Sequence, residues 1–438
     1  MTREEVLSTV ADRNIRFIRL LFTDMVGFLK CVTITSDELE DAIDNGKGFD
    51  GSSIEGFTRI HESDMIAKPD LSTFKIMPWN DDGEEGLLFC DVILPDGTPY
   101  PGDPRYVLRR TLERASERGW TQQVGIELEY FYFDSPDGKG LLDHAGYFDL
   151  SPPDLGEQLR KKTILALDAL GITVEYSHHE VAPSQHEIDL RHGDALTIAD
   201  ATMLSKLIIK EVARREGVYA TFMPKPMHGE NGNGMHTHQS LFDANGNVFF
   251  DENDEMHLSK VARSYTEGVL RHAREIAIVM DQWVNSYKRL VPGFEAPVYV
   301  CWARRNRSTL VRVPDYRPGN AAHTRIELRC PDPACNPYLA FSVMLAAGLK
   351  GIDEGYELRD AVEENIYAMT PEEREGHGIK MLPGSLGEAV AVAEDSALLR
   401  DTLGAESFGK LLRNKTALWD EYRSIVTPYE IEKDLPVL

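Results

Sequence analysis

Two glutamates spaced two residues apart, Glu127 and Glu129, are the first candidates for chemistry in this sequence. They lie within residues 124–133, where β-branched and aromatic side chains predict a strand. Side chains two apart on a strand share a face, so the two carboxylates project together. Because like charges repel and resist burial, a divalent ion is the simplest partner, and oxygen ligands favour Mg²⁺ or Mn²⁺ over zinc. The alternative is a strand with a solvated outer face.

Four further potential ligands follow along the chain. Glu180 and Glu187 flank a proline-containing turn that can bring both side chains toward one point. His236 and Glu327 lie on further strand-like segments. A cluster this acidic is not buried without metal, and it could hold two or three divalent ions that keep positions for water and phosphate oxygens. The alternative is a set of unrelated surface or core residues.

Arginines in loop-like regions form a second group of candidates: Arg289, Arg307, Arg312, Arg325 and Arg329. Guanidinium groups bind phosphate and carboxylate oxygens at two points. Together with divalent metal, they indicate a nucleoside triphosphate and phosphoryl transfer. The sequence has no P-loop motif, so a nucleotide would be bound in another way. For any single arginine, a structural salt bridge is the alternative.

The composition is that of a large globular protein. The 438 residues are 42% hydrophobic and 27% charged, which predicts a sizeable core and two domains. A net charge of −25 argues against nucleic-acid and anionic membrane surfaces. There is no span-length apolar run and no signal peptide, and the five cysteines contain no CxxC pair. These features predict a cytoplasmic protein with free thiols.

A stretch rich in proline, at 99–104, predicts the boundary between the two domains. Residues 1–100 are typical of a small mixed α/β domain. Residues 104–438 predict an α+β domain in which carboxylate-bearing strands are set between helices. Its first helix begins with Asp103 as N-cap and Pro104 at the first position.

The remaining segments comprise two irregular regions and two that are predicted to be helical. Residues 48–56 are glycine-rich and too polar for a helix or strand. Residues 257–284 predict two helical stretches, and 285–324 predicts a long irregular region with many arginines and prolines. The last hundred residues, to about 425, predict mostly helix.

Seven segments together resemble glutamine synthetase of the bacterial and archaeal type I class. They lie, in order over nearly the whole chain, at 48–54, 127–131, 178–187, 231–241, 285–297, 306–312 and 325–339. The two most specific stretches read Asn-Ser-Tyr-Lys-Arg-Leu-Val-Pro-Gly from position 285 and Pro-Asp-Pro-Ala-Cys-Asn-Pro from position 331. The resemblance implies an N-terminal β-grasp domain and a catalytic domain of antiparallel strands with helices. It also implies a homo-oligomer, a dodecamer of two hexameric rings with active sites between subunits.

The resemblance further implies a role for each candidate residue. The metal near glutamate and ammonia would be held by Glu129, Glu180 and Glu187. The metal near the ATP phosphates would be held by Glu127, His236 and Glu327. Substrate glutamate would be bound by Gly232, Arg289 and Arg329. ATP would be bound by His238, Arg307, Arg312 and Arg325.

The implied reaction is ATP-dependent ligation of ammonia to L-glutamate through γ-glutamyl phosphate, giving glutamine, ADP and phosphate. An ammonium pocket would be formed by Tyr147, Glu180 and Glu295, together with Asp50 and Ser53 of the neighbouring subunit. Such a pocket would take a proton from NH₄⁺, and Glu295 would also close a flap that keeps water out. The residues acting directly in catalysis would be Asp50, Glu295 and Arg312.

Two other functions stay open. A γ-glutamyl-amine ligase would join glutamate to a polyamine or ethanolamine, and a catalytically silent relative would serve as a nitrogen sensor. The complete ammonium pocket and the complete set of metal ligands favour the ammonia-dependent enzyme. For Asp50, a turn-stabilising role is the structural alternative.

Regulation follows the shorter, non-adenylylated alpha subclass in this interpretation. Arg59 lies in a stretch that resembles the one where this subclass senses glutamine, which predicts feedback inhibition. His61 replaces the glutamate more usual there. Tyr367 occupies the place of a modified tyrosine in other members, but the surrounding residues differ, so we expect it to be unmodified.

Overall fold

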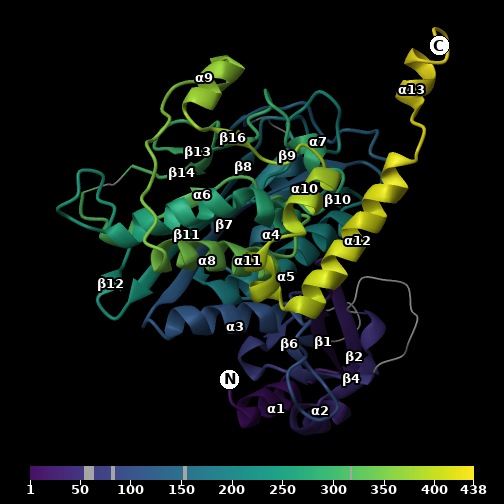
Figure 1. Cartoon of the computed structure of the whole chain (residues 1–438). Coiled ribbons are helices and arrows are strands. Elements are labelled where there is room, and N and C mark those ends of the chain that lie inside the picture. Colours follow the sequence, from purple (N-terminus) through teal and green to yellow (C-terminus); the bar gives the residue numbers. More distant parts are fainter. Residues whose placement is uncertain (54–63, 80–83, 151–154, 316–317) are drawn as a thin grey trace.

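The computed structural model describes residues 1–53, 64–79, 84–150, 155–315 and 318–438. Its strands form two sheets (Figure 1). The strands of the first precede the proline-rich stretch at 99–104 in the sequence, and those of the second follow it. Among the described residues, no helix combines the length and apolar character that a membrane crossing requires.

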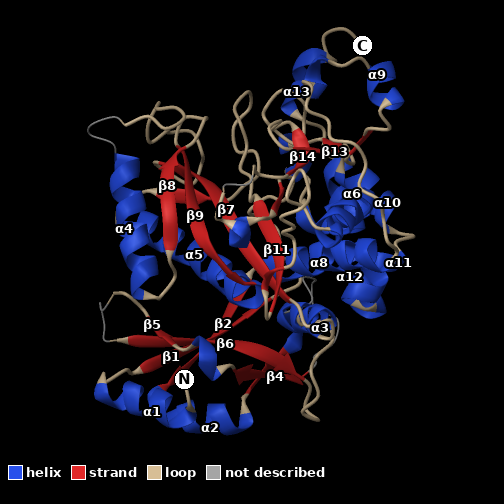
Figure 2. Ribbon diagram, turned by 90° about the vertical axis from the view of Figure 1, so that its left-hand side faces the viewer, coloured by secondary structure: helices blue, strands red, loops and turns tan. Residues whose placement is uncertain are grey.

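The N-terminal sheet has the strand order β2-β1-β6-β4-β3, with β5 beside β6. Its strands are β1 (Phe17–Thr23), β2 (Leu29–Thr35), β3 (Lys47–Asp50), β4 (Asp64–Pro69), β5 (Lys75–Ile76) and β6 (Glu85–Ile93). The helices α1 (Arg3–Asp12) and α2 (Leu39–Asn45) cover one face of this sheet (Figure 2). Val6 and Val10 of α1 and Leu39 of α2 are buried in the core between the helices and the strands.

The prediction of an irregular segment at 48–56 is wrong in its first part. Residues 47–50 form β3, which pairs antiparallel with β4. The ring of Phe49 packs on that of Phe22 with centroids 4.4 Å apart, and this contact outweighs the polar composition around it. Residues 51–53 form a single 3₁₀ turn, and 54–63 lie outside the described residues.

The second sheet has ten strands in the order β16-β13-β14-β15-β11-β7-β9-β8, with β10 beside β7 and β12 beside β11. They are β7 (Thr121–Phe133), β8 (Val174–His179), β9 (Gln185–Asp194), β10 (Tyr219–Thr221), β11 (Thr237–Asp243), β12 (Gly246–Asn247), β13 (Tyr299–Ala303), β14 (Thr309–Arg312), β15 (Ile326–Leu328) and β16 (Lys380–Met381). The expected antiparallel arrangement holds except that β13 and β14 run parallel. The N-terminal sheet also contains one parallel pair, β1 with β6.

The helices that follow α2 are α3 (Pro104–Ser116), α4 (Leu155–Ala169), α5 (Ala195–Arg215), α6 (Lys260–Met280), α7 (Ser286–Arg289), α8 (Pro337–Asp353), α9 (Pro371–Gly376), α10 (Leu386–Ala393), α11 (Ala397–Leu403), α12 (Ala405–Arg423) and α13 (Pro428–Lys433). As predicted, Asp103 caps α3, and its side chain accepts a hydrogen bond from the N–H of Arg105. Helix α5 packs against β7 and β9, while α6 packs along α8. Figure 1 shows α12 and α13 at the C-terminal end of the chain.

Two predictions for residues 257–324 are wrong. The region 257–284 contains one long helix, α6, because Ser259 caps it and an unbroken apolar face buries its length. The region 285–324 contains α7, β13 and β14. All five side chains of β13 are buried, so this strand lacks the polar alternation by which an exposed strand is recognised.

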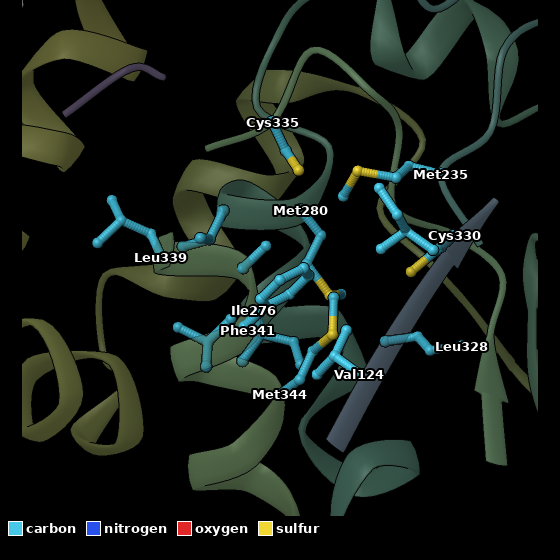
Figure 3. Packing of buried hydrophobic residues seen from close by; sticks show 14 of the residues in the cluster. Val124, Met235, Ile276, Met280, Leu328, Cys330, Cys335, Leu339, Phe341 and Met344 are labelled. Atoms are coloured by element: carbon cyan, nitrogen blue, oxygen red, sulfur yellow. The ribbon is translucent and has the colours of Figure 1, made fainter. Parts of the chain in front are cut away.

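The main core lies between the second sheet and its helices. Figure 3 shows Ile276 and Met280 of α6 packed with Leu339, Phe341 and Met344 of α8 and with strand side chains such as Val124 and Leu328. Ile126, Leu128 and Tyr130 of β7 belong to the same core. The alternate side chains of β7 therefore face the other side of the sheet.

Candidate active site

The face of the sheet opposite the core carries a polar cavity of about 310 Å³. It collects most of the residues singled out from the sequence: Glu127, Glu129, Tyr147, Glu180, Glu187, Gly232, His236, Arg289, Glu295, Arg307, Arg312, Glu327 and Arg329. Strand pairing explains this convergence. Glu129 lies opposite Glu187 across the β7–β9 pair, and Arg312 lies opposite Glu327 across the β14–β15 pair.

The segment that leads into β11 places the remaining ligand. The N–H of Glu127 donates to the carbonyl of His236 over 3.1 Å, and the N–H of Glu129 donates to that of Gly234 over 3.2 Å. A side chain at Gly234 would crowd three of the site residues. A Cβ atom would lie 2.8 Å from Nη2 of Arg289 and 3.0 Å from both Oε1 of Glu129 and Nε2 of His236.

One group of donor atoms consists of Glu127, His236 and Glu327, all within 4.8 Å of one another. Nδ1 of His236 lies 2.6 Å from Oε2 of Glu127 and 3.9 Å from Oε1 of Glu327. Two carboxylates with one imidazole fit a divalent cation, because each donor type ligates such ions in proteins. The group matches the set predicted for one of the two metals.

A second group consists of His178, Glu180 and Glu187. Nε2 of His178 lies 3.3 Å from Oε1 of Glu187, and its Nδ1 lies 3.5 Å from Oε1 of Glu180. Sequence reasoning placed Glu129 here and gave His178 no role. The missed signal is the spacing of His178 and Glu180, which is again two residues at a strand end.

Glu129 instead lies between the two groups. Its Oε1 is 4.0 Å from Nε2 of His236, and its Oε2 accepts hydrogen bonds of 2.9 Å from both Nε2 of Gln185 and the N–H of Gly234. Burial and the nearby charge of Glu180 raise the pKa of Glu129 well above its usual range. Burial and the charge of Glu129 do the same for Glu187. Both shifts favour the protonated forms of these side chains.

Burial also raises the pKa of Glu180, whereas Glu127 and Glu327 are stabilised in the charged form. Although burial opposes ionisation, hydrogen bonds from His236 and His238 keep the pKa of Glu127 well below its usual range. Burial likewise opposes ionisation of Glu327, but the charge of Arg329 holds its pKa at about 2. Arg329 donates to Oε1 of Glu327 over 2.6 Å, and Nε of Arg312 donates to Oε2.

These pKa shifts predict that the metal-free protein loses stability as the pH rises from about 5 to 8. A carboxyl whose pKa is raised on folding stabilises the fold below its unfolded pKa of about 4.3, and that contribution is lost as the pH rises through the folded value. Glu327 acts only at lower pH, because its pKa is depressed. We expect the melting temperature in EDTA to fall across this window, and excess Mg²⁺ to flatten the dependence by replacing the protons.

The Glu129→Gln variant is the control, because it removes one of the protonated carboxyls. Its melting temperature in EDTA should depend less steeply on pH than that of the unmodified protein. Equal slopes for the two proteins, measured by thermal unfolding at pH 5 to 8, would mean that the carboxyl cluster does not take up protons.

Arg289 is the most firmly held of the arginines. Its Nη1 donates to the carbonyl of Cys330 over 2.5 Å and its Nη2 to that of Arg329 over 3.0 Å. These bonds fix the guanidinium against the end of β15. Arg307 reaches the cavity from the opposite side, with Nη1 3.5 Å from the hydroxyl of Tyr147.

Three predicted ATP-binding residues, His238, Arg312 and Arg325, line a second cavity, of about 180 Å³. Nε of Arg325 donates to Nδ1 of His238 over 3.1 Å, so the ring proton of His238 is on Nε2, which donates to Oε1 of Glu127 over 2.7 Å. Glu127, Tyr176 and Arg312 line both cavities. The two cavities therefore adjoin at these three side chains.

Two predicted residues, Asp50 and Ser53, line neither cavity. Asp50 ends β3 and Ser53 lies in the following turn, where its Oγ donates to the carbonyl of Asp50 over 3.0 Å. Oδ1 of Asp50 accepts from the N–H of Ser52 over 3.0 Å, which is the turn-stabilising contact named as the structural alternative. Arg59 lies outside the described residues.

Comparison with known proteins identifies the family of this chain. The sequence model described as "Glutamine synthetase, beta-Grasp domain" matches residues 14–95, and "Glutamine synthetase, catalytic domain" matches residues 101–434. The chain is 49% identical to the glutamine synthetase of Mycolicibacterium smegmatis and 50% identical to that of Mycobacterium tuberculosis. The alignments cover 99% of both chains in the first case and 98% of both in the second. A solved structure of a GmaS/ADP complex superposes with a TM-score of 0.89 at 32% identity, covering 98% of this chain and 99% of the other.

A β-grasp domain followed by a catalytic sheet with this carboxylate- and arginine-lined cavity defines a class, the ATP- and divalent-metal-dependent ligases. The chain belongs to the glutamine synthetase family. It is a glutamate–ammonia ligase, which forms L-glutamine from L-glutamate, ammonia and ATP. The predictions of family, fold class and activity are thereby confirmed.

Proposed function

We propose that the two groups of donor atoms hold two Mg²⁺ or Mn²⁺ ions. The ion near the ATP phosphates would be held by Glu127, His236 and Glu327. The ion near glutamate and ammonia would be held by Glu180 and Glu187, with Glu129 or His178 completing the set. Ions held there would offset charge on the phosphate groups and orient the glutamate side chain.

The junction between the two cavities carries this proposal. ATP would occupy the smaller cavity beside His238 and Arg325, and glutamate the larger one beside Gly232, Arg289 and Arg329. Glu127 and Arg312, which line both, lie where the γ-phosphate would meet the side-chain carboxylate of glutamate. Phosphoryl transfer requires close and aligned reactants, and two adjoining cavities supply that alignment.

The arginines would act on charge during the transfer. A carboxylate is a poor acyl donor, so its oxygen first attacks the γ-phosphorus, and ADP leaves. Arg312, Arg307 and Arg329 would stabilise the negative charge that is shared among the phosphate oxygens. The resulting γ-glutamyl phosphate reacts with ammonia at the carbonyl carbon, and phosphate leaves.

The ammonium pocket would be completed by a neighbouring subunit. Tyr147 and Glu295 line the larger cavity. Glu295 has a φ of 55°, a left-handed backbone conformation that is uncommon for a residue other than glycine and that occurs often at functional sites. Asp50 and Ser53 lie on the other domain and would enter from the next chain of a hexameric ring. We propose a dodecamer of two such rings, with the domains divided at 1–100 and 104–438.

Regulation forms a separate part of the proposal. Arg59 would sense glutamine and mediate feedback inhibition. Tyr367 would stay unmodified, since its hydroxyl is half-buried and donates to the carbonyl of Ala296 over 2.9 Å. Ala296 follows Glu295 directly, so this bond would support the loop of the proposed ammonium pocket.

The test is phosphate release from ATP with Mg²⁺ and glutamate, comparing ammonia with a panel of primary amines and identifying the product by mass. Ammonia-dependent glutamine formation that collapses in Asp50→Ala supports the proposed pocket. Turnover only with a larger amine would instead assign the site to γ-glutamyl-amine ligation. Unchanged ammonia turnover in Asp50→Ala would remove Asp50 from the pocket.

A further inference from the structure

A third cluster of titratable side chains lies behind the metal groups and lines neither cavity. It consists of Asp143, His179 and His186. Oδ1 of Asp143 lies 2.8 Å from Nε2 of His179, and Oδ2 lies 3.5 Å from Nε2 of His186. Both imidazole side chains are fully buried. Two histidines with one aspartate could in principle hold a metal ion.

The partners of the two rings argue against a metal ion in this cluster. Nδ1 of His186 lies 2.6 Å from Nη1 of Arg160, and a guanidinium only donates, so Nδ1 accepts. The ring proton of His186 is therefore on Nε2, which leaves that nitrogen without a lone pair for a metal. Nε2 faces Oδ2 of Asp143 at 3.5 Å, and neither atom has a hydrogen-bond partner among the described residues.

His179 is held by acceptors on both sides. Its Nδ1 lies 2.7 Å from the carbonyl of Glu180, and its Nε2 lies 2.8 Å from the carboxylate of Asp143. Because a carbonyl and a carboxylate only accept, both ring nitrogens carry protons. These two contacts occupy both ring nitrogens of His179, so neither nitrogen is available to a metal ion.

The pair of Asp143 and His179 clamps the turn that carries the metal ligands. Oδ1 of Asp143 also accepts from the N–H of Ser184 over 2.9 Å. Oγ of Ser184 in turn accepts from the N–H of Leu142 over 2.7 Å and from that of Asp143 over 3.0 Å. Ser184 has a φ of 61°, a conformation that a serine adopts only when its surroundings hold it. Asp143 therefore holds the turn at both ends. It bonds to Ser184 directly and is connected to Glu180 through the ring of His179.

We propose that Asp143 and His179 are positioning residues that hold the turn at 180–184, so that Glu180 and Glu187 meet the same divalent ion. The inference rests on the metal assignment of the proposed function. Groups that orient metal ligands through a second layer of hydrogen bonds typically contribute about 10–100-fold to metal affinity. Neither residue touches the substrates in this arrangement, so the effect is expected on one metal ion alone.

The experiment is a Mn²⁺ titration of the assembled enzyme, with free Mn²⁺ measured by electron paramagnetic resonance. In Asp143→Asn we expect one bound ion to weaken by about 10–100-fold while the other keeps its affinity. Glu327→Gln, which disrupts the other donor group, should weaken the opposite ion and so identify each site. The matched control is Asp254→Asn. Asp254 also accepts two backbone N–H bonds and pairs with an arginine, but it lines neither cavity.

The outcomes separate the inference from the function on which it rests. Unchanged Mn²⁺ affinity in Asp143→Asn, or an equal loss at both ions, would overturn the positioning role. An unmodified enzyme that binds no Mn²⁺ would overturn the metal assignment itself. If Asp143→Asn does not fold, His179→Gln provides the test, because it removes the bond to the carbonyl of Glu180 and should give the same selective loss.

Discussion

Replacing Glu327 by glutamine is expected to lower kcat by roughly 10²–10⁴-fold. The side chain is fully buried and pairs with both Arg329 and Arg312, and it lies 3.9 Å from His236. Removing one preorganised charged or hydrogen-bonding group that stabilises the transition state typically lowers kcat by about 10²–10³-fold, and weaker binding of the proposed metal ion would add to this loss. The variant keeps its shape and one oxygen but loses the charge that pairs with the two arginines. Steady-state rates at saturating substrates measure the effect.

A matched control exists in the same domain. Glu267 is also buried and also bridges two arginines, Arg271 and Arg359, yet it lines neither cavity. Glu267→Gln should lower the melting temperature and leave kcat within a few-fold, since exchanging a distant buried carboxylate affects stability alone. If both variants lose activity equally, general destabilisation explains the result and Glu327 has no special place in the reaction.

The sequence was sufficient to predict the strands that carry the candidate metal ligands. A spacing of two residues places Glu127 and Glu129 on one face, because the pleat of a strand allows nothing else. The same period relates Glu327 to Arg329. The turn between Glu180 and Glu187 was equally predictable, since its proline and short length leave a hairpin as the simplest course. The structure brings all of these side chains to one cavity.

The remainder depended on contacts between distant segments. The parallel pair of β13 and β14 lies between β16 and β15 in the sheet. Its formation depends on these strands from other parts of the chain, and residues 285–324 contain no alternation of polar and apolar residues that would predict a strand. His178 follows the same two-residue rule as Glu127, but its packing against Phe148, with ring centroids 4.3 Å apart, is what turns it toward the glutamates. The clamp at Asp143 likewise joins residues that lie about forty positions apart.

The second large effect is expected from mixing two inactive variants in one ring. Asp50 lies on the N-terminal domain and lines neither cavity of its own chain, so it could reach an active site only in a neighbouring subunit. Asp50→Ala and Glu327→Gln are each expected to be nearly inactive when expressed alone. Co-expressed in equal amounts, they should recover about one-quarter of the unmodified activity. In a ring each site would take Asp50 from one chain and Glu327 from the next chain. After random mixing, half of the chains carry an intact Asp50 and the other half an intact Glu327. About one-quarter of the sites would therefore contain both intact residues.

Hybrid rings are isolated by carrying a different affinity tag on each variant and purifying over both. The comparison that decides is a co-expression of unmodified chain with the double variant Asp50→Ala/Glu327→Gln. Sites shared between subunits give about one-quarter activity in both mixtures, whereas sites within one chain give none in the first and about one-half in the second. The pair of values therefore reports where Asp50 acts. Recovery without a change in KM for ATP would place the action of Asp50 at the ammonia end of the site, away from the cavity proposed to bind ATP.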